Sequence, residues 1–297
     1  MKPFAIAGMQ LELSAVHENV TQMGQRLDVL MSVYPWVQMV VFSELAPFGP
    51  LISHAQSFPN RTEEIFQGWA KKHGIWLLPG SMFETVGDQI FNTATVIDPN
   101  GEIVGRYRKM FPFRPYEEGV EGGSEFLVFD VPDGGRFGVS ICYDLWFPET
   151  ARTLAALGAE VILHPTLTGT IDRDVELSIV RASAAQNQCF VFGINGFGDC
   201  GNGRSIICGP AGEVLYQGYS APEMIPLEID FERVRRSREF GLRGLGQQLK
   251  SFRDRNVEFS VYSPEARHWP YLRGLGPLKK PERGSQVGLH NPKELVQ

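Results

Sequence analysis

The cysteine in the stretch SICYDLWFPET, residues 140–150, lies where an apolar run ends and a helix is expected to begin. Cys142 follows the β-rich residues 136–141, and Pro148 suits the first position of a helix. A buried free cysteine is often only a small hydrophobic residue. Beside a helix N-terminus, however, the positive potential favours the thiolate, which is the nucleophilic form. Nucleophilic catalysis would also need a base, an oxyanion-stabilising group and a pocket.

Three ionisable residues elsewhere in the chain are candidate partners for this thiol. Glu44 ends the apolar stretch VVFSE, and its ordinary alternative role is a solvated charge at a strand edge. Lys109 lies in GRYRKMFPF, where it could instead be a surface lysine beside Arg106 and Arg108. Glu117 lies in RPYEEGVEGG, whose glutamates and glycines could simply form a solvated loop. Taken singly, none of these residues establishes a site.

The apolar pattern predicts strands that alternate with helices. Strands are expected at residues 3–11, 36–44, 75–83, 91–98, 136–141, 161–164, 189–195, 204–209, 212–218 and 224–230. Helices are expected at residues 16–31, 62–74, 148–157 and 172–188, with Gly74 and Gly158 as stop signals and an acidic cap at Asp172 or Asp174. This alternation predicts an α/β fold in which helices cover the sheets.

Composition and charge exclude several classes of protein. The chain has 297 residues, 43% hydrophobic and 21% charged, which is ordinary for a globular protein. A formal net charge of -6 argues against nucleic acid as the main partner. No apolar run approaches the roughly 20 residues of a membrane-spanning helix, and the first residues do not resemble a signal peptide. We therefore expect a cytoplasmic protein without a membrane partner.

The cysteines and histidines do not predict a metal site or a cofactor. The four cysteines show no CxxC spacing, and the six histidines form neither HxxxH nor HExxH. The glycine-rich stretches EGGSE and GDCGNGR match neither GxGxxG nor GxxxxGK[ST]. We expect reduced thiols, no zinc and no nucleotide cofactor.

The chain is expected to contain one main domain and an extension. The composition changes after about residue 241, and residues 273–297 are rich in glycine, proline and charge. Such a tail is either disordered or packed elsewhere, and the apolar side chains of Trp269, Tyr271 and Leu272 just before it favour packing. We predict a catalytic domain over residues 1–240 and an extension over 241–297 that docks on the body or on a neighbouring subunit.

Several motifs, taken in order, resemble those of one enzyme family. FSELAPFG, FNTATVIDPNGEIVGRYRKMFPF, PYEEG and ICYDLWFPE are similar to the motifs of the nitrilase superfamily, the carbon–nitrogen hydrolases, and the similarity covers about residues 3–230. The chain most resembles the aliphatic amidase and formamidase branch. The resemblance implies a four-layer α-β-β-α sandwich in which Glu44, Lys109 and Cys142 converge at one end of two sheets.

The resemblance also assigns roles to the candidate residues. Cys142 matches the nucleophile of the family. Glu44 matches its general base, and Lys109 matches the cation that stabilises the oxyanion. Glu117 matches the family's second glutamate, because it follows the lysine by eight residues in a P-x-E-G pattern, and we prefer it to Glu118. Many relatives have a Glu-Asn pair where this chain has Gln186-Asn187, which weakens the assignment to a subfamily more than the chemistry.

The substrate pocket is less defined by the sequence. Residues beside the motifs are expected to line it, and these are Phe113, Tyr116, Tyr143, Trp146, His164, Thr166 and Thr168. Tyr116 and Trp146 are equally consistent with ordinary core aromatics. Arg114 or Arg173 could bind a substrate carboxylate, although a surface position is the expectation for each.

The favoured activity is hydrolysis of a small amide to a carboxylic acid and ammonia through a cysteine thioester. Nitrilase or N-carbamoyl amine hydrolase activity, acyl transfer to another nucleophile, and a catalytically silent binding or scaffold protein are the alternatives. Nitrilases of this superfamily usually carry Cys-Trp-Glu, whereas this chain has Cys142-Tyr143-Asp144. The resemblance further implies a homodimer or a larger homo-oligomer.

Overall fold

The computed structural model describes residues 3–284, and the described chain divides into two compact units. The larger unit comprises residues 3–112 and 119–255, and the smaller unit comprises residues 113–118 and 256–284. Both main β-sheets belong entirely to the larger unit. The fold that positions the candidate thiol is therefore a property of the larger unit alone.

The first main sheet has the strand order β16-β1-β3-β4-β6-β5, with β7 and β8 also paired to β6. Its strands are β1 (Phe4–Gln10), β3 (Met39–Phe42), β4 (Trp76–Leu78), β5 (Met82–Val86), β6 (Gln89–Ile97), β7 (Ile103–Arg108), β8 (Val120–Glu121) and β16 (Glu223–Ile229). The strands β1, β3 and β4 are parallel, whereas β16 runs antiparallel to β1. Parallel neighbours need crossover connections, which α1 (Val20–Val33) and α2 (Arg61–His73) supply.

The second main sheet has the strand order β15-β14-β12-β11-β10-β9. Its strands are β9 (Val128–Asp130), β10 (Arg136–Val139), β11 (Val161–Thr166), β12 (Phe190–Asn195), β14 (Ile206–Cys208) and β15 (Val214–Gln217). The parallel strands β10, β11 and β12 are connected by α3 (Pro148–Ala156) and α4 (Arg173–Asn187). A separate short pair joins β2 (Glu12–Leu13) to β13 (Phe197–Gly198).

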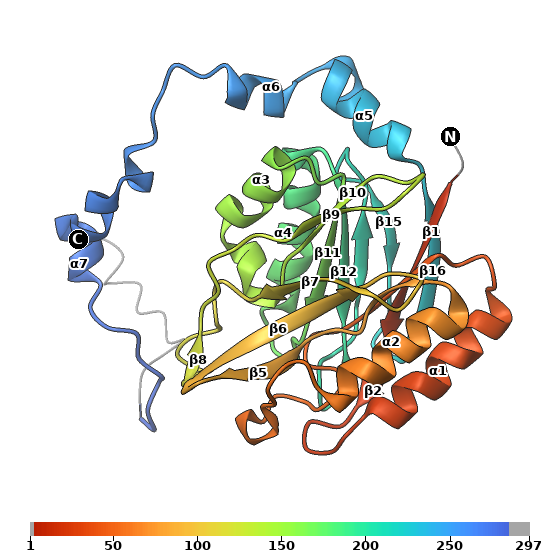
Figure 1. The fold of residues 1–297 in the computed structure, drawn as a ribbon. Helices are drawn as coiled ribbons and strands as arrows, with labels where there is room; N and C mark the ends of the chain where they lie inside the picture. The colour runs from red at the N-terminus through yellow and green to blue at the C-terminus, as the bar shows by residue number, and fades with distance from the viewer. Residues whose placement is uncertain (1–2, 285–297) are drawn as a thin grey trace. The chain divides into compact units, whose positions relative to one another are not determined.

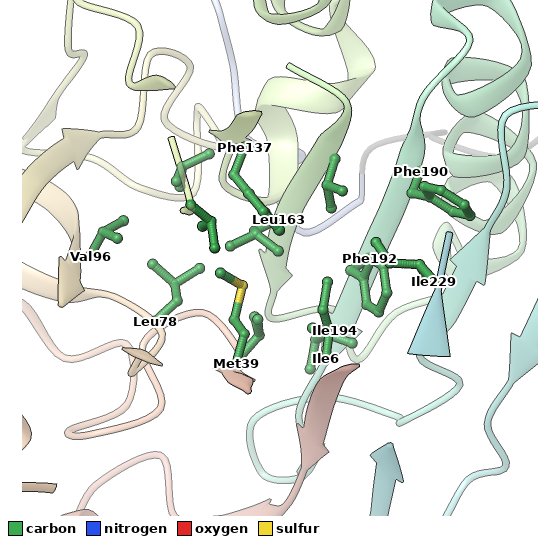
Figure 2. Packing of buried hydrophobic residues seen from close by; sticks show 14 of the residues in the cluster. Ile6, Met39, Leu78, Val96, Phe137, Leu163, Phe190, Phe192, Ile194 and Ile229 are labelled. Atoms are coloured by element: carbon green, nitrogen blue, oxygen red, sulfur yellow. The ribbon is translucent and has the colours of Figure 1, made fainter. Parts of the chain in front are cut away.

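The two sheets face each other, and a pair of helices covers the outer face of each one (Figure 1). Along β3, Met39 and Val41 point into the core between the sheets, whereas Val40 and Phe42 point toward α1 and α2. This alternation is what a strand buried on both faces requires. Figure 2 shows the central core, to which Leu163 and Phe192 of the second sheet also contribute. The predicted four-layer α-β-β-α sandwich is confirmed.

Gly8 on β1 faces the opposite sheet at short range. A Cβ atom built at that position would lie 2.3 Å from Cδ1 of Ile194 on the opposite sheet. A larger residue there would have to displace the end of the Ile194 side chain.

Several predicted elements differ from the structure, and the single strand expected at 75–83 is two strands, β4 and β5, separated by residues 79–81. Val16 does not belong to the first helix, which begins at Val20, and it is 51% exposed. The side-chain amide of Asn19 donates hydrogen bonds to the backbone oxygens of Ser14 and Ala46, which fixes the preceding residues as a loop. The strand expected at 36–44 is also shorter, because its regular pairing is confined to Met39–Phe42. Gly74, in contrast, ends α2 in a left-handed conformation with φ 63°, as predicted.

The segment after β16 contains α5 (Phe231–Phe240), α6 (Gln248–Arg253) and α7 (Pro270–Gly274), with short 3₁₀ turns at Leu242–Gly244, Ser260–Tyr262 and Pro264–His268. Another such turn, Ile52–His54, precedes α2. The α6 helix belongs to the larger unit, where the Arg152 guanidinium lies 5.2 Å from the Phe252 ring. The domain boundary at residue 241 stays a prediction, and residues 285–297 of the predicted tail lie outside the described residues.

Candidate active site

Glu44 and Lys109 form a buried ion pair. Glu44 follows β3, Lys109 follows β7, and Nζ of the lysine lies 2.8 Å from Oε1 of the glutamate. The two residues are only 2% and 1% exposed, so the solvated edge charge and the surface lysine are both ruled out. Asn92 on β6 donates a second 2.8 Å hydrogen bond from Nδ2 to the same oxygen. Three strands of the first sheet, β3, β6 and β7, thus hold one carboxylate and one ammonium in fixed positions.

Asn92 was not singled out from the sequence, although it lies in the motif stretch FNTATVID. Its neighbours Thr93 and Thr95 point to the other face of β6, where they donate to Glu84 and Glu63. A fully buried asparagine in a strand needs polar partners, and this requirement is the signal that could have identified it.

Cys142 begins a 3₁₀ turn, η2 (Cys142–Trp146), that follows β10. The cysteine has φ 46°, in the left-handed region that non-glycine residues rarely adopt. The prediction of a cysteine at a strand-to-helix corner is correct, but this 3₁₀ turn separates the thiol from α3 at Pro148. Backbone outliers of this kind concentrate at functional sites, where the surrounding structure stabilises them.

Asp144 holds this turn in place. Its carboxylate accepts hydrogen bonds from the Tyr107 hydroxyl at 2.6 Å, the Ile141 amide at 2.9 Å and the Phe111 amide at 2.8 Å. The residue is fully buried, and desolvation raises its pKa in spite of these donors. Asp144 therefore ties the turn that carries Cys142 to β7 and to the segment that follows Lys109.

The environment of the Cys142 thiol favours its neutral form. Burial raises the pKa of Cys142 well above its ordinary value, and the negative charges of Glu44 and Glu176 act in the same direction. Lys109 and a hydrogen bond with the Leu167 backbone oppose this shift only in part. Desolvation therefore outweighs any stabilisation of the thiolate by a helix N-terminus, and the net shift is toward the neutral thiol.

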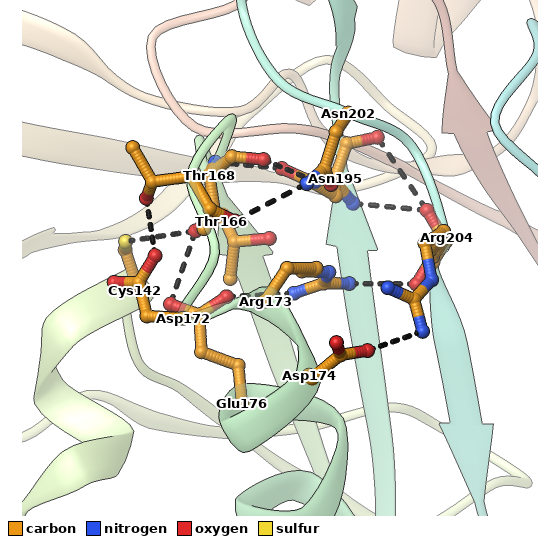
Figure 3. Close-up of polar contacts among 12 residues, drawn as sticks. Cys142, Thr166, Thr168, Asp172, Arg173, Asp174, Glu176, Asn195, Asn202 and Arg204 are labelled. Carbon is orange, nitrogen blue, oxygen red and sulfur yellow. Dashed lines mark hydrogen bonds and ion pairs between the residues drawn. The ribbon is translucent and has the colours of Figure 1, made fainter.

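Thr168 lies beside the thiol, with its Oγ1 4.0 Å from Sγ of Cys142 (Figure 3). Its hydroxyl donates to Oε1 of Glu176 at 3.0 Å, and the Arg173 guanidinium pairs with the other carboxylate oxygen at 3.0 Å. Arg173 is 1% exposed, so the expected surface position for this residue was wrong. The ion pair with Glu176 and a hydrogen bond to the Arg204 carbonyl oxygen compensate the burial of its charge.

Glu176 was missed because it reads as an ordinary charged residue of the predicted helix. It lies on the face of α4 that also carries the buried Leu177 and Val180. A charge between buried apolar helix positions is the pattern that could have identified it.

Two predicted pocket residues of β11 lie inside the second sheet. His164 is 2% exposed, and its Nδ1 lies 2.8 Å from the Ser140 hydroxyl. Burial, and secondarily the Arg173 charge, lowers the pKa of His164 to about 3. The Thr166 hydroxyl donates to the Ile194 carbonyl oxygen at 3.3 Å. Their assignment to substrate binding stays a prediction.

Aromatic side chains surround the turn that carries Cys142. The Tyr143 ring meets the Phe147 ring edge to face at 5.2 Å, and it lies 6.0 Å from the Trp146 ring. The Trp146 indole also donates to Glu176 at 3.5 Å. Tyr143 and Trp146 are partly exposed, as pocket walls would have to be.

Glu117 and Tyr116 belong to the smaller unit. The Glu117 carboxylate accepts a hydrogen bond from the Phe113 amide, which closes a tight local turn. The Tyr116 ring stacks on the Phe113 ring at 5.3 Å, and Nζ of Lys280 lies 5.4 Å from its centre. The side chain of Tyr116 is 55% exposed, so it is not a core aromatic. The catalytic role of Glu117 stays a prediction.

Within residues 3–284, no group of three or more histidine, cysteine, aspartate or glutamate side chains could hold a metal ion. Over the same range all four cysteines are buried and none forms a disulfide. None of the described helices has the length and apolar character that crossing a membrane would require.

Comparison with known proteins connects this geometry to a family. The model of the carbon–nitrogen hydrolase family matches residues 5–239. A 2-oxoglutaramate amidase of Bacillus subtilis is 30% identical over 211 residues, which cover 68% of this chain and 81% of that protein. A formamidase of Bacillus cereus is 27% identical over 226 residues, covering 72% and 68% of the respective chains.

A solved structure shares the same fold. Nit3 of Saccharomyces cerevisiae, a member of branch 10 of the nitrilase superfamily, superposes with a TM-score of 0.74 at 23% identity and covers 80% of this chain and 94% of its own. The prediction of an amide-hydrolysing enzyme with the nitrilase fold is thereby confirmed. The family match begins in β1 and ends in α5, and this chain belongs to the carbon–nitrogen hydrolase family.

Proposed function

We propose that this enzyme hydrolyses small linear amides to a carboxylic acid and ammonia through a thioester on Cys142. The main support for the proposal is the buried Glu44–Lys109 ion pair. Both of its charges affect the pKa of the buried Cys142 thiol, Glu44 raising it and Lys109 lowering it. A carboxylate, an ammonium and a thiol are the base, electrophilic stabiliser and nucleophile that acyl transfer needs.

The first step is deprotonation and attack. The resting thiol is neutral, so a base must take its proton as the Cys142 sulfur bonds to the amide carbon. Glu44 is that base. The Lys109 ammonium and a backbone N–H near Tyr143 stabilise the resulting oxyanion, and loss of one such donor typically costs about 3 kcal/mol.

The second half returns the enzyme to its starting state. Protonated Glu44 delivers its proton to the amide nitrogen as the carbon–nitrogen bond breaks, which releases ammonia and leaves an acyl-thioester. Glu44 then accepts a proton from water, whose oxygen attacks the thioester carbon. When the carbon–sulfur bond breaks, the acid leaves and the proton on Glu44 returns to Cys142.

Glu117 is proposed to orient the substrate amide, with Tyr116, Tyr143, Trp146, His164 and Thr166 as the predicted substrate-binding residues. Two relatives are named for activity on amides, a 2-oxoglutaramate amidase and a formamidase. These names and the Cys142-Tyr143-Asp144 sequence favour a short linear amide over a nitrile. We also propose a cytoplasmic location and a homo-oligomeric state, both on the family resemblance.

A substrate panel tests the reaction class. Simple amides, ω-amides, N-carbamoyl amines and nitriles are scored by ammonia release, and intact-mass spectrometry detects a covalent acyl adduct. We expect turnover of at least one short amide and loss of both signals in Cys142→Ala. Turnover of nitriles alone would replace the amidase assignment, and a protein inert toward the whole panel would favour a binding or scaffold role.

A matched pair of variants tests the base. Glu44→Gln keeps the shape of the side chain and removes its basicity, so kcat/KM for the best amide should fall by roughly 10³-fold. The control is Glu63→Gln, because Glu63 is another fully buried carboxylate, paired with Arg106 on the outer face of β7. This control should lose stability but retain kcat/KM within about threefold. Equal activity losses in the two variants would contradict a specific role for Glu44.

A further inference from the structure

The Thr168 hydroxyl lies between the nucleophile and a second buried carboxylate. Its Oγ1 is 4.0 Å from Sγ of Cys142 and 3.0 Å from Oε1 of Glu176. The three residues are 9%, 5% and 7% exposed, and they come from η2, the loop after β11 and α4. Figure 3 shows this row of side chains together with Arg173. The proposed chemistry already assigns the base to Glu44, so it leaves this second carboxylate unused.

The direction of the hydrogen bonds follows from the chemistry of the three groups. The second oxygen of Glu176 pairs with the Arg173 guanidinium, so Glu176 is held as a carboxylate that only accepts hydrogen bonds. A hydroxyl has one hydrogen, and Thr168 donates it to Glu176. What Thr168 presents to Cys142 is therefore an oxygen lone pair, which can accept a hydrogen bond from a thiol but cannot stabilise a thiolate.

Hydrogen bonds fix the backbone of Thr168, which keeps its hydroxyl directed at Glu176. Its backbone N–H donates to Oδ1 of Asn195 at 2.9 Å, and Nδ2 of Asn195 donates to its carbonyl oxygen at 2.9 Å. Arg173 is fixed in turn by the Arg204 carbonyl oxygen at 2.9 Å. Both ends of the Glu176–Thr168 contact are therefore anchored to the second sheet and its loops.

On the proposed thiol chemistry, we infer that Thr168 and Glu176 are positioning residues that keep the Cys142 sulfur protonated until substrate binds. The oxygen of the fixed hydroxyl accepts a hydrogen bond from the S–H group, and the Glu176 carboxylate behind it opposes a negative charge on sulfur. Two other charged groups act on the sulfur: Glu44 opposes the thiolate, and Lys109 favours it. The Arg173 guanidinium on α4 is a third, and its charge attracts a negative charge on sulfur. A thiol held in this way reacts slowly with oxidants and adventitious electrophiles, because the thiolate is the reactive form.

The test is the pH dependence of Cys142 alkylation by iodoacetamide, which needs no amide substrate. Peptide mapping by mass spectrometry follows Cys142 separately from the three other buried cysteines. Thr168→Val keeps the shape of the side chain and removes the hydroxyl, and Glu176→Gln removes the charge. Both variants should alkylate about tenfold faster than the parent at pH 7, equivalent to about one pH unit in the thiol titration.

Two further variants control for side effects. Thr168→Ser restores a hydroxyl and should return the parent profile. Asp174→Asn removes a carboxylate two residues from Glu176, but Asp174 is 75% exposed and pairs with Arg204, so alkylation should not change. Circular dichroism verifies folding, and Thr168→Val leaves the Arg173–Glu176 pair intact should Glu176→Gln fail to fold.

The sign of the effect decides the inference. Faster alkylation of Thr168→Val supports it, whereas slower or unchanged alkylation overturns it, because the hydroxyl would then activate the thiolate or not affect it. Failure of the amide panel leaves this readout intact, so the inference and the proposed amidase activity can fail separately.

Discussion

At the scale of single residues, the site contains buried ionisable groups that form pairs of opposite charge. Glu44 with Lys109 and Glu176 with Arg173 are ion pairs that are almost completely removed from water. Burying an isolated charge costs several kcal/mol, so each member depends on its partner. A site built from such pairs loses much of its geometry when one partner is removed.

His164 gives the molecule a predictable sensitivity to acid. Its pKa in the folded chain is about 3, below the ordinary value of 6.5, so the unfolded chain binds more protons between these two values. The stability associated with neutral His164 is complete above pH 6.5 and is lost as the pH falls toward 3. From pH 7 to pH 4.5 this amounts to roughly 2–3 kcal/mol.

Urea unfolding at pH 7 and pH 4.5 measures this loss. In His164→Asn the difference between the two pH values should be smaller by roughly 2–3 kcal/mol, whatever the substitution costs at pH 7. The same pH difference in the parent and the variant would show that His164 is not the titrating group.

At the scale of elements, the short 3₁₀ turn that carries Cys142 depends on one carboxylate. Asp144 accepts two backbone amides, those of Ile141 and Phe111, and the Tyr107 hydroxyl. In Asp144→Asn, either orientation of the new amide would direct its NH₂ group at a backbone N–H. We expect a loss of about 2–4 kcal/mol in the free energy of unfolding and a larger fall in kcat than rise in KM.

Tyr107→Phe is the control for this turn. It removes one donor and leaves both backbone hydrogen bonds of Asp144, so it should cost only about 1 kcal/mol. Urea unfolding and ammonia release measure both variants. An Asp144→Asn enzyme with parental kcat would mean that the turn does not require this carboxylate.

The elements also show what the sequence could predict. Most strands and the four main helices follow directly from apolar periodicity, because each buries a defined face in a layered core. The loop at Val16 and the 3₁₀ turn at Cys142 could not be predicted from the local sequence. Both depend on hydrogen bonds that Asn19 and Asp144 make with residues far away in the sequence. The place of Glu176 in the site could not be predicted for the same reason, because its partner Thr168 lies outside α4.

At the scale of the whole molecule, the smaller unit carries many apolar side chains that are at least 40% exposed. In its described residues these are Tyr116, Val257, Phe259, Val261, Tyr262, Trp269, Tyr271, Leu272, Leu275 and Leu278. Apolar surface on this scale is more typical of a segment that binds another chain than of a free surface.

Sedimentation velocity tests the predicted assembly. The full chain should sediment as a dimer or larger multiple of its 33.2 kDa mass. A variant that lacks residues 256–297 should shift to a smaller species, because these residues carry exposed apolar side chains. A full chain that sediments as a monomer at micromolar concentration would reject the homo-oligomer.

The position of β1 has a consequence for synthesis on the ribosome. This strand is synthesised before the other strands of its sheet, yet its neighbour on one side is β16, which pairs Ile229 with Phe4. Until β16 has been translated, one edge of β1 remains open and available to strands of other nascent chains. Release of a polypeptide that stops short of β16 would therefore expose a template for aggregation, and complete translation is what closes this edge of the sheet.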